Sequence, residues 1–122
     1  MSDISLGERM RRGDVLAPHC PSRVVLRQLT STWGVLVLLA LRDGMLRFTQ
    51  LRRRVGDVSD RMLAQTLKQL EAHNLVERRS FPVVPPHVEY RLTPLGEDAA
   101  NRIAQLTDWI EHRLPDFGAA AA

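Results

Sequence analysis

Residues 75–92 constrain the fold of this chain more than any other segment. Leu75 to Phe81 and His87 to Leu92 are each typical of a strand, and the prolines between them, which cannot donate to a ladder, limit pairing to the two flanking runs. Asn74 suits the left-handed position that ends a helix, and Thr93-Pro94 is a capping residue followed by proline at a first helical position. The pattern predicts a hairpin with a proline-stiffened tip between two helices.

The rest of the chain is mainly helical by its apolar spacing. Trp33 to Arg42 is apolar nearly all round, which predicts a central helix buried on several sides. The expected helices cover about residues 21–29, 33–42, 49–55, 60–73 and 94–114, and the brief run 45–48 is expected to be a short strand. Thr49 is the expected cap of the third helix and Ser59 of the fourth.

The helix after Ser59 has two different faces. Its apolar positions, expected to face the core, are Met62, Leu63, Leu67 and Leu70. The opposite side carries a stripe with the spacing i, i+3, i+4, i+7, formed by Arg61, Ala64, Gln65 and Lys68. Arginine, amide and lysine side chains are the types that contact bases and phosphates.

Composition limits the chain to one domain. Its 122 residues are 44% hydrophobic and 25% charged, and the longest apolar run, residues 33–41, is too short for a membrane span of roughly 20 residues. One cysteine, Cys20, excludes an internal disulfide, and four histidines without ligand spacing argue against a metal. We therefore expect a cytoplasmic, nucleoid-associated protein with no cofactor, no metal and no membrane partner.

Charge is unevenly placed along the chain. The net charge is +3, but residues 45–92 hold nine basic and five acidic side chains, whereas residues 93–122 hold two basic and five acidic ones. A basic middle followed by an acidic end is expected if the middle faces a polyanion.

The predicted order of elements is that of a winged helix-turn-helix domain, an α+β fold that is mainly α. We expect a flexible arm at residues 1–19, the domain at 20–115 and a frayed tail at 116–122. An apolar stripe on the last helix is too long for one small domain to cover, so the first and last helices are expected to form a homodimer interface. The expected interface residues are Leu26, Leu95, Ala99, Ile103, Leu106, Trp109 and Ile110.

Several segments resemble the HxlR-type transcriptional regulators of bacteria and archaea, which are MarR-like. The most specific is the ungapped run from Val84-Pro85-Pro86-His87 to Thr93-Pro94-Leu95-Gly96, and the likeness covers about residues 20–112. Shorter matching pieces are Cys20-Pro21, Arg47-Phe48-Thr49-Gln50-Leu51, Val58 to Leu67 and Leu70-Glu71. The chain departs from the family with Ser31-Thr32 in place of Gly-Lys, and with His73-Asn74 in place of Asp-Gly.

A winged helix-turn-helix protein of this kind is expected to bind double-stranded DNA. Its second helix enters the major groove with the N-terminal part nearest the bases, which makes Arg61 and Gln65 the expected base readers. The resemblance also implies a wing near the neighbouring minor groove or backbone. The full set of expected contacts is Ser59, Arg61, Gln65, Thr66, Lys68, Arg78, Arg79 and His87.

Cys20 precedes a helix that starts at Pro21, so its thiol is expected to feel the positive end of the helix dipole, which favours the thiolate. The resemblance implies sensing of quinones, aldehydes or oxidants by a cysteine at this place. The simpler alternative is a small buried residue that seats the first helix.

The leading hypothesis is a homodimeric regulator, a repressor binding inverted-repeat operators, gated by oxidation or electrophile modification of Cys20. The expected effector is a small molecule or an electrophile. An enzyme is disfavoured because no phosphate loop and no nucleophile–base pair is evident. Two alternatives stay open: a small-molecule-responsive regulator without redox chemistry, and a winged-helix module that binds protein.

Overall fold

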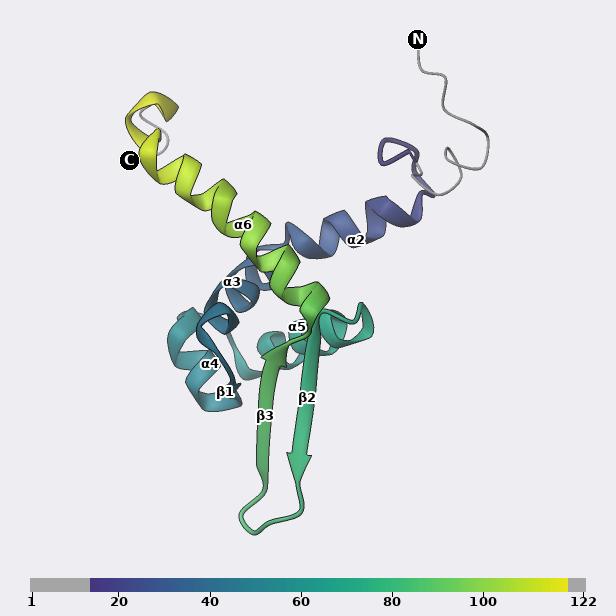
Figure 1. Ribbon diagram of the computed structural model, residues 1–122, viewed down its shortest axis with the longest axis vertical. Helices are drawn as coiled ribbons and strands as arrows, with labels where there is room; N and C mark the ends of the chain where they lie inside the picture. Colours follow the sequence, from purple (N-terminus) through teal and green to yellow (C-terminus); the bar gives the residue numbers. More distant parts are fainter. Residues whose placement is uncertain (1–13, 119–122) are drawn as a thin grey trace.

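A computed structural model describes residues 14–118 and contains the predicted elements in the predicted order (Figure 1). Residues 1–13 of the expected arm and 119–122 of the expected tail lie outside that range. The elements are α2 (Pro21–Leu29), α3 (Thr32–Ala40), β1 (Leu46–Arg47), α4 (Phe48–Val55), α5 (Asp60–Ala72), β2 (Val76–Phe81), β3 (His87–Leu92) and α6 (Pro94–His112), with 3₁₀ turns at Leu41–Asp43 and Leu114–Phe117. The fold is the predicted winged helix-turn-helix.

The sheet has three antiparallel strands in the order β1-β3-β2. Leu46 pairs with Tyr90, and the β2–β3 ladder runs from Val76–Leu92 to Phe81–His87. Pairing therefore stops where the prolines begin, as predicted. The hairpin projects well beyond the helices and forms the wing (Figure 1).

The core is built around α3, which packs against α4, α5 and α6. Its Val37 and Leu38 have no exposed surface, and neither do Leu51 of α4 and Leu63 and Leu70 of α5. The prediction of a central helix buried on several sides is confirmed.

Side-chain caps begin three of the helices. The hydroxyl oxygens of Ser31, Ser59 and Thr93 accept hydrogen bonds from the backbone N–H three residues ahead, at 3.2, 3.1 and 2.9 Å. The expected cap at Thr49 is wrong, because α4 begins one residue earlier and Gln50 Oε1 accepts from the Arg47 N–H at 2.8 Å. An amide three residues into a helix can satisfy the free N–H at its start, which a hydroxyl search alone overlooks.

The buried face of α5 differs from the prediction at one position. Met62 was expected in the core but is 42% exposed, whereas Thr66 is only 5% exposed. The buried positions are Leu63, Thr66, Leu67 and Leu70, which keep the i, i+3, i+4, i+7 spacing. Thr66 can occupy this face because its hydroxyl donates to the Met62 carbonyl at 2.8 Å, which satisfies its polar group.

Small residues let α6 lie close to the sheet and α3. Its buried positions are Gly96, Ala100 and Ala104, four residues apart on one face. At Gly96 the helix approaches the backbone so closely that a Cβ would meet the carbonyl carbon of Leu75 at 2.9 Å and the carbonyl oxygen even more closely. On the apolar stripe of α6, Leu95 and Leu106 are about half exposed, whereas Ala99 and Ile103 are partly buried against the core.

Within residues 14–118 no single helix is long and apolar enough to cross a membrane. Taken together, α2 and the segment Thr32–Asp43 are long and apolar enough for a membrane span, but the two are bent by 66° relative to each other. The second member of that pair is the central core helix, so burial in the protein accounts for its apolar composition.

Candidate nucleic-acid interface

The two helices of the helix-turn-helix are α4 and α5, joined by residues 56–59. Gly56 has φ +83°, a backbone region that favours glycine, and Ser59 caps α5 through the Met62 N–H. Arg52 Nε lies 3.0 Å from Asp60 Oδ1, so an ion pair between exposed side chains links the two helices. The direction of α5 relative to α4 is set mainly by the packing of both helices against α3.

The predicted stripe of α5 is exposed. Arg61, Ala64, Gln65 and Lys68 are all exposed and lie opposite the buried leucines. Arg61 stands in the first turn, at the end of the helix that a helix-turn-helix protein places nearest the bases. Glu71 is exposed as well, and its position three residues after Lys68 continues the same stripe.

Thr66 does not belong with these residues. It is almost fully buried and its hydroxyl is occupied by the Met62 carbonyl. The prediction that Thr66 contacts DNA is therefore wrong for this conformation, because the 3.6-residue turn carries position 66 to the core side of α5.

A groove between α5 and the stem of the wing brings stripe and wing together. Its volume is about 620 Å³, and we call it the α5–wing groove. It is lined by Arg61, Ala64, Gln65, Leu67, Lys68, Glu71, Arg78 and Tyr90. Leu67 and Tyr90 are at most 9% exposed, so the groove has an apolar floor and charged or polar walls.

The outer wing holds the remaining predicted contacts. Arg79 lies over the Phe81 ring, 5.7 Å from its centroid, and Phe81 meets the His87 ring edge-on at 5.1 Å. His87 Nε2 is 2.6 Å from Glu89 Oε2. Arg79 thus remains exposed at the wing surface, whereas His87 is half-buried and already engaged with Glu89.

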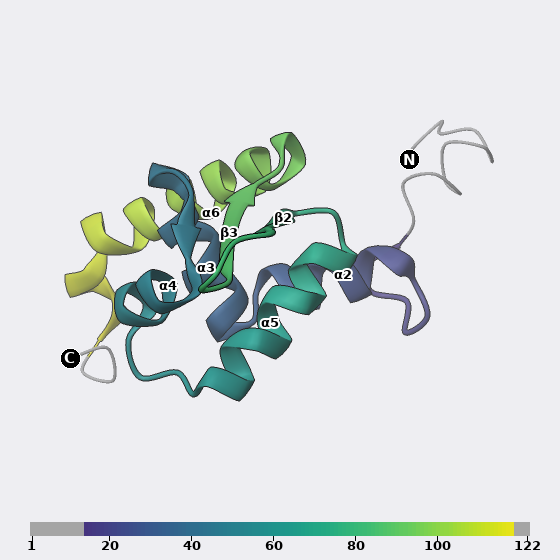
Figure 2. The same ribbon diagram turned by 90° about the horizontal axis from the view of Figure 1, so that it is seen from below.

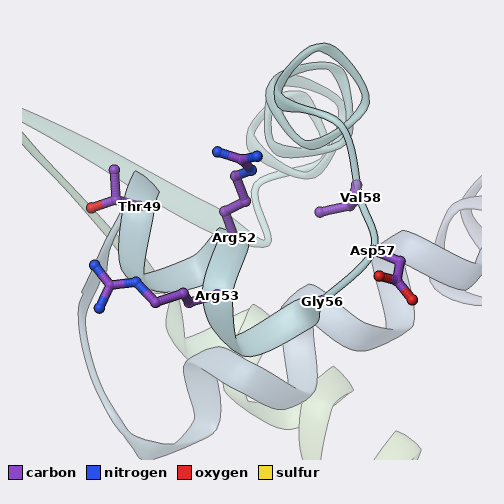
Figure 3. Close-up of a pocket in the computed structure, with 6 residues that line it drawn as sticks. All are labelled: Thr49, Arg52, Arg53, Gly56, Asp57 and Val58. Atoms are coloured by element: carbon purple, nitrogen blue, oxygen red, sulfur yellow. The ribbon is translucent and has the colours of Figure 1, made fainter.

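A second hollow, of about 520 Å³, lies beside the turn between α4 and α5 (Figure 3). Thr49 and Arg53 stand on one side of it and Asp57 on the opposite side, with Arg52 between them (Figure 3). Arg52 is paired with Asp60, while Arg53 makes no ion pair with any residue that the structure describes.

The basic side chains of residues 14–118 fall into two groups. Those with a carboxylate partner are Arg52, Arg54, Arg91, Arg102 and Arg113. Nine have none, and six of these lie on α4, α5 and the sheet: Arg47, Arg53, Arg61, Lys68, Arg78 and Arg79; the other three are Arg23, Arg27 and Arg42. Seen from the wing side, α4 and α5 lie together on one side of the molecule and α6 on the other (Figure 2). Uncompensated positive charge is thus concentrated around the helix-turn-helix and the wing.

Another groove, apolar and also about 620 Å³ in volume, lies between α2 and α6. We call it the α2–α6 groove. Six of the seven predicted interface residues line it: Leu26, Leu95, Ala99, Ile103, Leu106 and Ile110. The seventh, Trp109, lies outside the lining and meets the Phe117 ring edge-on at 5.6 Å. His73 Nδ1 is buried beside the groove without a hydrogen-bond partner in the described part of the chain.

Cys20 occupies the N-cap position of α2 and is 7% exposed. It is not part of the central core cluster. The helix that it precedes, α2, projects away from the body of the domain (Figure 1). Turns in residues 14–19 precede it. The Leu16 N–H donates a hydrogen bond to Asp14 Oδ1, and the Arg23 guanidinium donates one to the Leu16 carbonyl. A hydrogen bond from the Ser22 side chain lowers the pKa of the Cys20 thiol, and backbone hydrogen bonds add to this against the opposing effect of burial.

Sequence reasoning missed two members of the α5–wing groove, Glu71 and Tyr90. Glu71 could have been found by extending the i, i+3, i+4, i+7 stripe by one more turn. Tyr90 is a core residue that also forms the groove floor, because it is paired with Arg78 across the ladder. No group of three or more metal-ligating side chains occurs in the described residues.

Comparison with known proteins agrees with this geometry. The family model described as HxlR-like helix-turn-helix matches residues 28–117. The HTH-type transcriptional regulator YtfH of Escherichia coli K12 is 53% identical over 116 residues, which are 95% of this chain and 92% of YtfH.

Two solved structures are similar along most of their length. That of the regulator ytfH from Salmonella typhimurium has a TM-score of 0.81 and 57% identity, covering 86% of this chain and 94% of its own. The redox regulator HypR in its reduced form has a TM-score of 0.70 and 32% identity, covering 76% of this chain and 92% of its own. With an exposed helix of the helix-turn-helix, a basic wing and a family match that covers residues 28–117, the chain belongs to the HxlR-like helix-turn-helix family of transcriptional regulators.

Proposed function

We propose that this transcriptional regulator reads its operator with α5 in the major groove and grips the backbone with the wing. The observation that carries the proposal is the set of cations without carboxylate partners around the α5–wing groove, described above. Leaving positive charges uncompensated on one face costs little when that face binds a polyanion, because the phosphates then neutralise them.

Each contact follows from its position on α5 or the wing. Arg61 and Gln65 lie toward the N-terminal end of the exposed stripe and are the base readers; arginine pairs best with guanine and glutamine with adenine. Lys68, Arg78 and Arg79 lie farther along the groove and wing, where backbone phosphates are the partners. Ser59 contacts a phosphate in addition to capping α5. His87 lies on the wing, which approaches the DNA backbone.

The working unit is a homodimer whose two copies cover each other's α2–α6 groove. Gln28 is the one buried residue of α2, while Val24 and Leu26 are about half exposed. Leu95, Leu106 and Trp109 of α6 are 52 to 54% exposed, so the two helices offer a continuous apolar surface that their own chain does not cover. A two-fold dimer predicts an inverted-repeat operator with half-sites about 10 bp apart, or a multiple of that distance.

The domain at residues 20–115 carries both DNA binding and dimerisation. Residues 1–19 form an N-terminal arm and residues 116–122 a C-terminal tail. The protein works as a repressor at the nucleoid in the cytoplasm, by occupying a promoter. The family match over residues 28–117 supports the DNA-binding part of this proposal.

Cys20 gates this binding by reacting with an electrophile. A lowered thiol pKa and a place at the N-cap of α2, the helix that contributes Leu26 to the proposed dimer surface, support this role. Addition to an electrophile uses a single thiol, which suits a chain whose one cysteine is Cys20. With a quinone, the thiolate sulfur forms a bond to a ring carbon and the ring takes up a proton, which leaves a hydroquinone thioether. The similarity to the redox regulator HypR supports the same role.

The proposal is tested by binding of the purified full-length protein to its own upstream intergenic DNA, titrated across salt concentration. Arg61→Ala is expected to weaken operator binding by about 5- to 150-fold, the loss of one good base contact. Arg113→Ala removes an exposed arginine outside the proposed DNA interface, with the same change in net charge, and is expected to have little effect on operator binding. Equal losses in the two variants, or wild-type binding no tighter than to unrelated DNA, would contradict the proposal.

A further inference from the structure

Glu71 is the one carboxylate among the residues that line the α5–wing groove. The same lining holds three cations, Arg61, Lys68 and Arg78. Glu71 is exposed and forms no ion pair with any of them, nor with another residue in the described part of the chain. Its charge therefore stays uncompensated on the face that is proposed to bind DNA.

The place of Glu71 along α5 argues against a role in reading bases. It lies ten residues after Arg61, which is about 15 Å along a helix. In a helix-turn-helix protein the N-terminal residues of this helix contact the base edges, so a side chain nearly three turns farther on is expected closer to the phosphates. A carboxylate there repels the DNA backbone.

We infer that Glu71 weakens the sequence-independent affinity of this protein for DNA. The inference rests on the proposed function, since it assumes that the α5–wing groove receives the DNA backbone. Phosphate contacts supply essentially all non-specific binding, and the genome offers a large excess of non-specific sites. A negative charge among the phosphate-binding cations shortens the time spent on such sites and leaves the base contacts of Arg61 and Gln65 untouched.

The test compares Glu71→Gln with Glu111→Gln. Glutamine has nearly the helix propensity of glutamate, and both substitutions raise the net charge by one. Glu111 is exposed on α6, on the other side of the molecule, and likewise has no ion pair in the described residues. The pair therefore separates a local effect in the groove from a general effect of charge.

Binding to operator and to unrelated DNA of equal length is measured by fluorescence anisotropy between 50 and 200 mM salt, roughly the range over which phosphate contacts dominate. If removing Glu71 acts like gaining one phosphate contact, the slope of log K against log salt becomes steeper by about 0.9, and lowering the salt fourfold raises the affinity by about 3.5-fold more than in the wild type. Operator and unrelated DNA are expected to gain by the same factor.

Three results would overturn the inference. In the first, Glu71→Gln and Glu111→Gln have the same salt slope. In the second, Glu71→Gln weakens binding, which would make Glu71 a residue that positions Lys68 or Arg78. In the third, only operator binding changes, which would make Glu71 a base reader. The proposed function itself fails separately, if the wild-type protein shows no preference for operator DNA.

Discussion

Substituting Gly96 by alanine tests the way α6 is docked on the sheet. Alanine normally stabilises a helix relative to glycine, by about 0.4 to 1 kcal/mol. Here the new Cβ would lie 2.9 Å from the Leu75 carbonyl carbon and 3.3 Å from Leu92 Cδ2, with the Leu75 oxygen closer still. Carbon atoms pack at about 3.5 to 4.0 Å, so α6 has to move outward.

The cost of that movement can be estimated from what it disturbs. Overpacking of this kind costs about 1 to 3 kcal/mol. Two hydrogen bonds hold the start of α6 to the segment before β2. The Thr93 N–H donates to the Leu75 carbonyl at 3.1 Å, and the Thr93 hydroxyl donates to the Asn74 carbonyl at 2.7 Å. Each contributes about 1 kcal/mol net. We expect Gly96→Ala to lower the free energy of unfolding by about 2 to 4 kcal/mol.

The assay is urea unfolding followed by circular dichroism, at two protein concentrations so that dimerisation is accounted for. Gly56→Ala is the comparison, because a Cβ there meets nothing within 4 Å and the cost comes from its φ of +83° alone. That cost is about 1 to 2 kcal/mol. Unchanged or increased stability in Gly96→Ala would refute the close approach of α6 to Leu75.

Three further predictions concern the proposed surfaces. Lys68→Ala should weaken binding to operator and unrelated DNA alike and make the salt slope shallower by about 0.9, as the loss of one phosphate contact requires; a change in operator preference instead would contradict its backbone role. Leu106→Glu should raise the dimer dissociation constant at least about 100-fold, because two charges enter an apolar interface, whereas Leu114→Glu outside the α2–α6 groove should not; sedimentation equilibrium decides. Cys20 should react with a quinone faster than free cysteine at pH 7, with the rate falling as pH drops through the lowered pKa of the thiol; a rate equal to that of free cysteine at every pH, or DNA binding of Cys20→Ser that still responds, would contradict the gating role.

Local patterns were sufficient to predict most of the fold. The caps at Ser59 and Thr93, the left-handed Asn74 and the prolines of the wing tip each act over a few residues, so their effect can be predicted without tertiary information. The exposed stripe of α5 was predictable for the same reason, since helix periodicity alone places Arg61, Gln65 and Lys68 on one side.

Features that depend on neighbouring elements were harder to predict. Met62 is exposed and Thr66 is buried, the reverse of the expectation, because the positions of α3 and the sheet decide which side of α5 is buried. Thr66 can be buried because its hydroxyl donates a hydrogen bond to the Met62 carbonyl. The α5–wing groove needs the hairpin to approach α5, which no spacing within either segment shows. Helix periodicity could place Glu71 on the exposed stripe, but only the structure shows that it lines the same groove as Arg78.

Methylation protection of guanine N7 on the operator tests the central claim most directly, because N7 lies in the major groove where α5 is proposed to bind. The account predicts two protected clusters about 10 bp apart, or a multiple of that distance, and loss of protection at the same guanine of each half-site in Arg61→Ala. Operator binding without major-groove protection, or protection that Arg61→Ala leaves unchanged, would contradict it.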